Sequence, residues 1–304
     1  MSQRIVVTGA GGMLGRVLTD QARRAGHEVL ALTSSECDIT DRESVRRHVA
    51  AGDVVINCAA YTQVDAAETD EARAYEVNAV GAGNIAQVCA QTGADLVHVS
   101  TDYVFNGVFE GDRRPYEVDD ETGPINAYGR TKLAGEQAVL AAKPDAHVVR
   151  TAWVYKGGEG TDFVATMRRL AAGDKVIDVV DDQIGSPTYV DDLAAALLQL
   201  TGSEVDAPVL HAVNSGVASR FELAQATFAA VGADPERVRP VGSDRHPRPA
   251  TRPNYTVLSQ QRSVAAGLTG LRDWRDALLA AVGTREGKAT ADRNGTAGQL
   301  PSTP

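Results

Sequence analysis

The 304-residue sequence is poor in cysteine and in aromatic residues, and it has no long apolar segment. Its three cysteines, Cys37, Cys58 and Cys89, have neither the spacing of a zinc site nor the pattern of a disulfide framework. No secretory signal is evident, and no apolar run approaches the ~20 residues that span a bilayer. We therefore expect a cytoplasmic protein with reduced, structural thiols and no contact with membranes.

Basic residues are also in deficit, with 30 Lys and Arg against 40 Asp and Glu, which gives a net charge of −10. A field of this sign opposes non-specific binding to nucleic acid and to anionic membranes. An anionic ligand would therefore need a local cluster of hydrogen-bond donors. The carboxylates form no evident metal-binding cluster, and we expect no essential metal.

Short apolar segments alternate with helical patterns through the first half of the chain. This alternation predicts βαβ units and a parallel sheet covered by helices on both faces. The expected strands are Arg4–Thr8, Glu28–Leu32, Val54–Asn57, Leu96–Ser100 and Val148–Thr151. The expected helices are Leu14–Ala25, Ser44–Ala50, Ala66–Thr92 with an interruption near Gly81 and Gly83, and Ala127–Ala142.

The pattern changes after Trp153, where helices are separated by long stretches that contain proline and glycine. Proline-rich Asp244–Asn254 should be extended rather than helical. Residues 284–304 lack apolar periodicity, and we expect a disordered tail. The expected helices of this half are Phe163–Ala172, Val190–Leu200, Phe221–Val231 and Leu271–Val282.

A glycine-rich segment, Thr8–Gly15, lies between the first strand and the first helix. Its glycines would permit a tight turn and a close backbone approach to a pyrophosphate, which the free N–H groups of the helix N-terminus would bind. An ordinary glycine-rich turn is the alternative, but the strand–turn–helix context favours dinucleotide binding. The predicted cofactor-binding residues here are Gly9, Gly12, Met13, Leu14, Gly15 and Arg16.

The end of the second strand indicates which dinucleotide binds. The sequence Ala31–Ser35 has no carboxylate to grip the ribose hydroxyls of NAD, and its hydroxyls could accept a 2′-phosphate. We therefore expect NADPH, with NADH possible. Asp38 and Ile39 would suit the adenine, although Asp38 could instead cap a helix ahead of Ser44. Small residues after the third strand, where a backbone would pass close to a ribose, add Asn57, Ala59, Ala60 and Tyr61 to the predicted cofactor site.

With these features the sequence predicts an α/β protein with a Rossmann-type, doubly wound parallel sheet and a smaller, mixed α/β C-terminal substrate domain. We expect residues 1–150 to form the dinucleotide-binding domain and residues 151–283 to form mainly the substrate domain. A strand and helix near 174–200 should return to the first domain.

Tyr128 and Lys132 are spaced i and i+4 on a predicted helix, so they share one face. A nearby ammonium favours the phenolate and would lower the pKa of the tyrosine. A solvated pair on a helix surface is the alternative. The preceding strand ends in Ser100 and Thr101, whose hydroxyls could polarise a carbonyl group, and this makes the pair more specific.

The glycine pattern, Ser100–Thr101 and the Tyr128–Lys132 pair, in this order, resemble the extended short-chain dehydrogenase/reductase family from Arg4 to about Val282. The resemblance implies that Tyr128 transfers a proton to or from the substrate oxygen. It also implies that Lys132 assists Tyr128 and holds the nicotinamide ribose, and that Thr101 hydrogen-bonds the carbonyl. Asn78 matches an asparagine of the family's helix near the active site.

Longer runs are similar to the dTDP-4-dehydrorhamnose reductase family: Ser100–Gly107, Tyr128–Glu136, Arg150–Tyr155, Asp182–Thr188 and Thr251–Pro253. This resemblance implies reduction of the C4 ketone of dTDP-4-dehydro-β-L-rhamnose to dTDP-β-L-rhamnose, a supply of rhamnose for cell-surface polysaccharide. It implies a nucleotide-sugar partner and a monomer or weak homodimer. The implied substrate-binding residues are Thr62, Thr101, Tyr103, Trp153, Gln183 and Arg252.

Three other functions are weighed against this one. A sugar-nucleotide dehydratase would carry a second carboxylate after Asp102, where this sequence has Tyr103. A reductase or epimerase of another nucleotide sugar is not excluded by any single residue. A non-catalytic NADP-binding regulatory subunit, as in methionine adenosyltransferase, is disfavoured by the intact Thr101, Tyr128 and Lys132.

Overall fold

Six parallel strands form the central sheet of the structure, a computed structural model that describes residues 3–109, 111–202 and 205–283. The chain runs from β1 to β2 on one side of β1 and then returns to β3 on its other side, so the direction of winding reverses between β1 and β3. This confirms the Rossmann-type, doubly wound sheet. In spatial order the strands are β10 (Val209–His211), β5 (His147–Thr151), β4 (Asp95–Thr101), β3 (Val54–Asn57), β1 (Ile5–Thr8) and β2 (Val29–Leu32).

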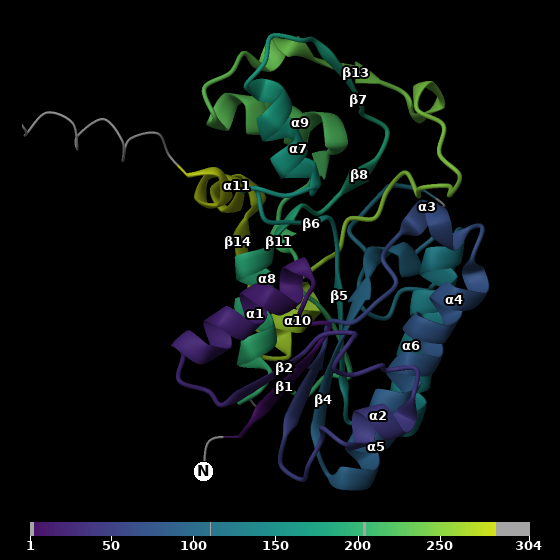
Figure 1. Ribbon diagram of the computed structural model, residues 1–304. Coiled ribbons are helices and arrows are strands. Elements are labelled where there is room, and N and C mark those ends of the chain that lie inside the picture. The colour runs from purple at the N-terminus through teal and green to yellow at the C-terminus, as the bar shows by residue number, and fades with distance from the viewer. Residues whose placement is uncertain (1–2, 110, 203–204, 284–304) are drawn as a thin grey trace, which may run out of the picture.

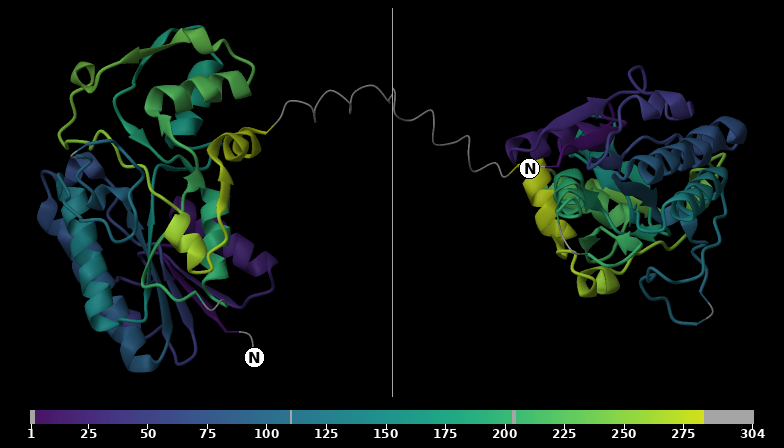
Figure 2. Two further views of the ribbon diagram at one scale, coloured as in Figure 1. Left: turned by 180° about the vertical axis from the view of Figure 1, so that it is seen from behind. Right: turned by 90° about the horizontal axis from the view of Figure 1, so that it is seen from below.

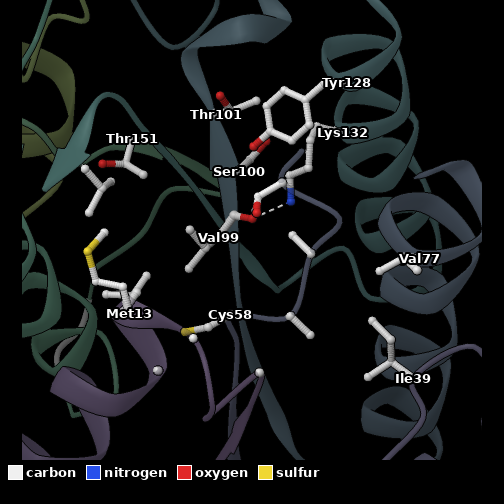
Figure 3. A pocket seen from close by; sticks show the side chains of 18 of the residues that line it. Met13, Ile39, Cys58, Val77, Val99, Ser100, Thr101, Tyr128, Lys132 and Thr151 are labelled. Atoms are coloured by element: carbon white, nitrogen blue, oxygen red, sulfur yellow. Dashed lines mark hydrogen bonds between the residues drawn. The ribbon is translucent and has the colours of Figure 1, made fainter. Parts of the chain in front are cut away.

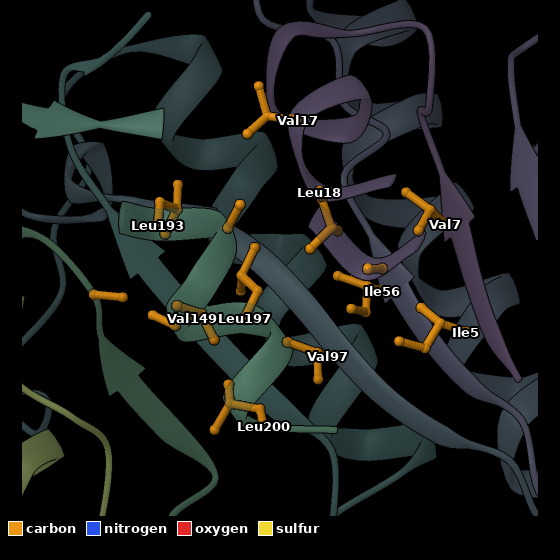
Figure 4. Packing of buried hydrophobic residues seen from close by; sticks show 14 of the residues in the cluster. Ile5, Val7, Val17, Leu18, Ile56, Val97, Val149, Leu193, Leu197 and Leu200 are labelled. Carbon is orange, nitrogen blue, oxygen red and sulfur yellow. The ribbon is translucent and has the colours of Figure 1, made fainter. Parts of the chain in front are cut away.

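The strands are short apolar runs because the sheet is buried on both faces. All residues of β1 and β3 are buried, as expected for parallel strands between two helical layers. On one face, α1 (Met13–Arg24) and α8 (Val190–Gln199) pack together over Ile5, Val97 and Val149 (Figures 1 and 4).

The opposite face is covered by α2 (Arg42–Arg46), α5 (Ala82–Thr92) and α6 (Ala127–Ala142), which lie together in Figure 1. The α6 helix brings the predicted Tyr128 and Lys132 close to the carboxyl end of β4. It begins at a cap in which the Asn126 side chain accepts a hydrogen bond from Gly129 N. A Cβ on Gly129 would overlap the carbonyl oxygen of Tyr103, so the glycine allows α6 to approach the segment after β4.

The helix expected over Ala66–Thr92 is divided at two places. A short helix, α3 (Val64–Ala67), is separate from α4 (Glu71–Tyr75), which begins where the Asp70 side chain caps it by accepting from Arg73 N. The expected interruption near Gly81 is a π-helical segment, η1 (Glu76–Gly81), which leads directly into α5. Such segments are frequent at functional sites, and this one carries Asn78.

A smaller α/β part lies beyond the carboxyl ends of the sheet strands, at the top of Figure 1. Its strands pair as β6 (Val154–Tyr155) with β9 (Thr188–Tyr189), β7 (Ile177–Val180) with β13 (Val238–Val241), β8 (Ile184–Gly185) with β12 (Ala218–Ser219), and β11 (Asn214–Ser215) with β14 (Leu271–Asp273). Its α-helices are α7 (Phe163–Ala171), α9 (Arg220–Ala230) and α11 (Trp274–Val282). The short helix α10 (Gln261–Ala265) instead packs beside β10 of the central sheet. Short 3₁₀ turns are η2 (Asp102–Val104), η3 (Pro235–Arg237) and η4 (Ser243–Arg245).

The last expected helix, Leu271–Val282, is wrong at its start. Its first three residues form β14, and the helix begins only at Trp274 because the Asp273 side chain accepts from Arg275 N and caps it. In Figure 2 the yellow β14 and α11 lie beside α8 and α9. The expected extended segment Asp244–Asn254 contains the end of one 3₁₀ turn and otherwise no helix or strand.

The chain after Trp153 contributes to both parts of the molecule. Strand β10 joins the central sheet and α8 packs on α1, whereas β7 pairs with β13 outside the sheet. The division into domains at residue 150 stays a prediction, and the predicted tail, 284–304, lies outside the described residues. Within the described ranges no helix has the length and apolarity needed to cross a membrane.

Candidate functional site

A cavity of about 600 Å³ opens at the carboxyl ends of β1, β3 and β4, where the winding of the sheet reverses (Figure 3). Open α/β sheets bind their ligands at this place. The predicted site residues that line it are Gly9, Gly12, Met13, Leu14, Gly15, Asp38, Ile39, Ala59, Ala60, Thr62, Thr101, Tyr128, Lys132 and Trp153. The predicted residues outside the lining are Arg16, Asn57, Tyr61, Asn78, Tyr103, Gln183 and Arg252.

The glycine loop has the form that a pyrophosphate requires. No side chain caps the N-terminus of α1 at Gly12, and its first turn carries no acidic residue, so its N–H groups and dipole are available to an anion. Gly9 has a φ of +70° and lies so close to Ala59 that an added Cβ would come within 2.6 Å of its nitrogen. A Cβ on Gly15 would overlap the Gly9 carbonyl oxygen. The donor set and the close backbone approach therefore fit a dinucleotide.

At the far end of the cavity, Asp38 is exposed and holds a local turn. Its carboxylate accepts from Thr40 N at 3.0 Å and from Thr40 Oγ1 at 2.7 Å, and these hydrogen bonds lower its pKa. The alternative in which Asp38 caps the next helix is wrong, because Asp41 caps α2 by accepting from Glu43 N. Ile39 is buried and presents an apolar surface to the cavity, as an adenine would require.

Of the residues expected to bind a 2′-phosphate, only some lie at this end of the cavity. Ser34 lines the cavity, but the hydroxyl of Thr33 is engaged by Glu36, whose Oε2 it reaches at 2.7 Å. Arg16 is exposed and outside the cavity lining. Arg73, which sequence reasoning missed, lines this end and forms an ion pair with Glu76.

Tyr128 and Lys132 project from α6 into the cavity beside Ser100 and Thr101 of β4 (Figure 3). Thr101 hydrogen-bonds the Tyr128 phenol. Lys132 is 2% exposed, and its Nζ donates to the Val99 carbonyl oxygen at 2.7 Å. The two side chains and the Thr101 hydroxyl thus meet at one wall of the cavity, as predicted.

Burial controls the protonation of this pair. It raises the pKa of Tyr128 well above its usual range, although the Thr101 hydrogen bond opposes the rise. It also lowers the pKa of Lys132 to about 8, because an ammonium loses its hydration there. The expected lowering of the Tyr128 pKa is therefore wrong in this structure, since desolvation of the buried phenol dominates. Tyr128 is a neutral phenol at pH 7, the form that can donate a proton.

Asp102 is a buried acid next to this pair that sequence reasoning did not assign to the site. Its carboxylate accepts from Thr101 Oγ1 at 3.0 Å and from Thr256 Oγ1 at 2.6 Å. Burial nevertheless raises its pKa from 3.8 to about 6. The carboxylate fixes the Thr101 hydroxyl, which in turn contacts Tyr128.

Asn78 braces the wall behind the cavity rather than lining it. Its Oδ1 accepts from Tyr61 N at 2.8 Å, and its Nδ2 donates to Tyr61 O at 3.1 Å and to Thr131 Oγ1 at 3.0 Å. These bonds tie η1 and the segment after β3 to α6. Asn78 and Tyr61 therefore do not line the cavity but hold the segments that do.

At the other end of the cavity, Trp153 has an unusual backbone conformation. Its φ of +47° is the only positive value at a non-glycine residue in the described part of the chain, and such strain is frequent at functional sites. The Cζ of Arg220 lies 3.6 Å from the Trp153 ring centroid, and a Cβ on Gly185 would come within 2.6 Å of the same ring. The indole is therefore held between Arg220 and Gly185.

The remaining predicted substrate residues lie around this indole. Tyr103 meets the Tyr128 ring edge-on, with centroids 5.8 Å apart, and both Arg220 and Arg252 interact with its phenol. Arg252 is paired with Asp65, so its guanidinium is not free. Gln183 Nε2 donates to Ser243 Oγ at 3.2 Å, outside the cavity.

Two further lining residues carry buried hydroxyls. Within the described residues, Ser100 Oγ and Thr151 Oγ1 have no hydrogen-bond partner. Such orphaned groups fit a polar ligand that would satisfy them. Both lie in runs quoted above, Ser100 in Ser100–Gly107 and Thr151 in Arg150–Tyr155, but neither was among the predicted binding residues. Burial raises the pKa of Cys58, another lining residue, to about 12, so its thiol stays protonated.

The described residues contain no group of three or more His, Cys, Asp or Glu side chains that could hold a metal ion. The absence of an essential metal stays a prediction.

The doubly wound sheet, the glycine loop and the Tyr128–Lys132 pair define the class of the extended short-chain dehydrogenases/reductases. Within it, the family described as the RmlD substrate binding domain matches residues 3–285, and the chain belongs to this family. The predicted resemblance is confirmed.

Individual relatives agree with this assignment. A dTDP-4-dehydrorhamnose reductase of Mycolicibacterium smegmatis is 71% identical, with 100% of this chain and 90% of the relative covered. A dTDP-4-dehydrorhamnose reductase of Mycobacterium tuberculosis is 59% identical, with 99% of this chain and 98% of the relative covered. The crystal structure of a dTDP-4-dehydrorhamnose reductase from Bacillus anthracis in complex with NADP is 36% identical. It has a TM-score of 0.84 and covers 91% of this chain and 98% of that chain.

Proposed function

We infer that this protein reduces the C4 ketone of dTDP-4-dehydro-β-L-rhamnose with NADPH and forms dTDP-β-L-rhamnose. The observation that carries the inference is the meeting of Thr101, Tyr128 and Lys132 at one wall of a cavity that begins at the uncapped N-terminus of α1. The relatives named dTDP-4-dehydrorhamnose reductase support the choice of substrate. A non-catalytic NADP-binding role is disfavoured, since it would need none of these three side chains.

The cofactor assignment is supported by the Bacillus anthracis relative, which binds NADP. In this chain, the Gly9–Gly15 loop and the N-terminus of α1 would hold the pyrophosphate, and Ile39 would contact the adenine. Ser34 and Arg73 lie where polar groups could meet a 2′-phosphate. When bound, NADPH supplies the hydride for the reduction.

The chain's own contribution is to hold the ketone and to deliver the proton. The neutral Tyr128 phenol would donate a hydrogen bond to the C4 oxygen and stabilise the alkoxide charge that develops there. Thr101 would add a second hydrogen bond once its hydroxyl proton, which points to Asp102 in this structure, turns to that oxygen. Tyr128 then gives its proton to that oxygen. Lys132, anchored on the Val99 carbonyl, is placed to restore the Tyr128 proton and to contact the ribose.

The sugar would lie against Trp153, with Tyr103 and Thr62 nearby. Arg220 and Arg252, which both lie beside Tyr103, would present positive charge to the diphosphate of the substrate, with the charge of Arg252 partly balanced by Asp65. The two guanidinium groups would supply the local cluster of donors that a protein of net charge −10 needs for an anionic ligand. A cytoplasmic location and a monomeric or weakly dimeric state stay predictions.

The test is NADPH consumption, followed by absorbance, with dTDP-4-dehydro-β-L-rhamnose generated from dTDP-glucose by a dehydratase and a 3,5-epimerase. Loss of absorbance that requires Tyr128, is absent with a UDP-linked ketosugar and yields dTDP-rhamnose would support the proposal. A folded protein that binds NADPH but consumes none with this substrate would overturn it.

A further inference from the structure

A line of buried polar side chains crosses three adjacent strands of the sheet beneath the cavity. Thr8 of β1, Asn57 of β3 and His98 of β4 are register partners on three adjacent strands, so their side chains lie side by side on one face. Each is at most 2% exposed. The line ends at Lys132 of α6, whose Nζ lies 3.4 Å from His98 Nε2.

The direction of the hydrogen bonds along this line is determined by one backbone group. Ala59 N can only donate, and it donates to Asn57 Oδ1 at 3.0 Å, where Thr8 Oγ1 also donates at 2.7 Å. The amide nitrogen of Asn57 therefore faces His98 Nδ1, at 2.9 Å. Since an amide nitrogen only donates, His98 Nδ1 must accept and carries no proton. A neutral imidazole then has its proton on Nε2.

This tautomer places an N–H donor against the amine of Lys132. A positively charged Nζ has three donors and no acceptor, so it can form no hydrogen bond with His98 Nε2–H. A neutral amine has a lone pair and can accept one, while it still donates to the Val99 carbonyl. The Thr8–Asn57–His98 line therefore favours the neutral form of Lys132 and fixes the direction of its lone pair.

The other ionisable groups around Lys132 do not reverse this preference. Cys58, after β3, is a protonated thiol, and Tyr128, one turn earlier on α6, is a neutral phenol. Glu136, one turn later on α6, favours the ammonium, but its carboxylate is already paired with Arg150 of β5 at 2.8 Å. His98 is itself buried, and burial beside Lys132 lowers its pKa well below the usual range, so it stays neutral.

We propose that His98 is a positioning residue for Lys132: through its Nε2–H it holds the amine in place and makes the ammonium easier to deprotonate. The consequence for catalysis rests on the function proposed above. A Lys132 that exchanges its proton near neutral pH can return a proton to Tyr128 after each turnover, which a permanently charged ammonium could not do.

Nuclear magnetic resonance tests the proposal without any turnover. The sequence has five lysines and six histidines, so protein labelled at lysine Cε and at the imidazole nitrogens gives few signals. The signals of Lys132 and His98 are assigned by their loss in Lys132→Met and His98→Asn. We expect His98 to carry its proton on Nε2 throughout the stable pH range. A proton on Nδ1 would overturn the proposal.

Two variants and one control then test the coupling. His98→Asn keeps an acceptor for Asn57 but removes the N–H that faces Lys132. Isosteric Asn57→Asp should draw the His98 proton to Nδ1 and leave Nε2 as an acceptor. In both, the titration midpoint of Lys132 should rise by about one pH unit. Val97→Ala truncates a buried side chain on the opposite face of β4 and should leave the midpoint unchanged.

In His98→Asn, the apparent pKa of the alkaline limb in the pH profile of kcat/KM for NADPH oxidation should rise by the same amount. KM should change less. The proposal would be overturned, even if the protein is a reductase, by equal Lys132 titration midpoints in wild type and both variants. Equal here means within roughly 0.2 pH units. If the Lys132 midpoint moves while no ketosugar is reduced, the positioning role stands and the proposed function fails.

Discussion

The two ends of the cavity are built in different ways. At the nucleotide end, backbone groups and small side chains from a continuous segment, Gly9–Gly15, and from the residues just after β3 form the surface. At the proposed sugar end, Trp153 lines the cavity, and large or charged side chains from distant positions, Tyr103, Arg220 and Arg252, pack together behind the lining. The first end depends on local geometry, whereas the second depends on tertiary packing and on balanced charge.

The difference in construction corresponds to a difference in the proposed role of each end. In the proposed function the nucleotide end recognises features that all dinucleotides share, so backbone N–H groups and a helix dipole would suffice. The sugar end must select one substrate, and its arginines are balanced by the carboxylates of Asp65 and Asp102. Thr101, Tyr128 and Lys132 stand between the ends. Changes at the three places should therefore affect different measurable quantities, and four predictions follow this division, beginning with the largest effect on activity.

Tyr128→Phe should lower kcat by about 10²–10⁴-fold with little change in NADPH affinity, because the proton donor is lost while the dinucleotide surface is intact. Steady-state kinetics and a fluorescence titration with NADPH measure the two quantities. Tyr103→Phe is the matched control, since it removes a neighbouring phenol that is placed at the sugar and should change kcat less than tenfold. Equal losses in the two variants would contradict the assignment of Tyr128.

Gly15→Ala should weaken NADPH binding by about tenfold or more, because the added Cβ would overlap the Gly9 carbonyl and displace the loop from the α1 N-terminus. Gly11→Ala is the matched control in the same loop. Its Cβ would meet only Thr33 Cγ2, at an ordinary 3.6 Å, and binding should stay near wild type. Similar dissociation constants for both variants, by titration calorimetry, would show that the loop does not bind the dinucleotide.

Asp102→Asn should change the dependence of stability on pH. Burial raises the pKa of Asp102 from 3.8 to about 6, so the folded protein holds this proton more tightly than the unfolded chain. Its contribution to the unfolding free energy is thus present below pH ~4 and is lost as the pH rises through ~6, by up to about 3 kcal/mol. Urea unfolding at pH 4.5 and 7 should therefore show Asp102→Asn gaining stability relative to wild type. A constant difference between the two proteins would refute the shift.

Arg220→Met should raise KM for the ketosugar about tenfold, a loss of ~1.4 kcal/mol, with a smaller change in kcat, because the cation that orders Trp153 is removed. Arg220→Lys should recover part of the loss. In a Trp274→Phe background, Trp153 is the single tryptophan, and its fluorescence should lose sensitivity to substrate in Arg220→Met. An unchanged KM would remove Arg220 from the sugar end.

The contrast between the ends also explains what the sequence could predict. The positions of the first five strands, the glycine loop and α6, with its bounds Ala127–Ala142, follow from local patterns and were predicted correctly. Arg220 could not be found in this way, since it lies 67 positions from Trp153 and follows an ordinary helix cap at Ser219. The lowered pKa expected for Tyr128 was wrong for the same reason: its desolvation depends on neighbours from other segments. The strand at Leu271–Asp273 was missed because its pairing partner, β11, is distant in sequence.

The central claim is that this site joins hydride transfer from NADPH to protonation by Tyr128 at C4 of a dTDP-linked ketosugar. The most direct measurement uses NADPH deuterated at C4 of the nicotinamide and follows the product of dTDP-4-dehydro-β-L-rhamnose by nuclear magnetic resonance and mass spectrometry. The account predicts dTDP-β-L-rhamnose with one deuterium, located at C4 of the sugar, and almost none formed by Tyr128→Phe. Product without deuterium, deuterium at another carbon, or undiminished product from Tyr128→Phe would contradict it.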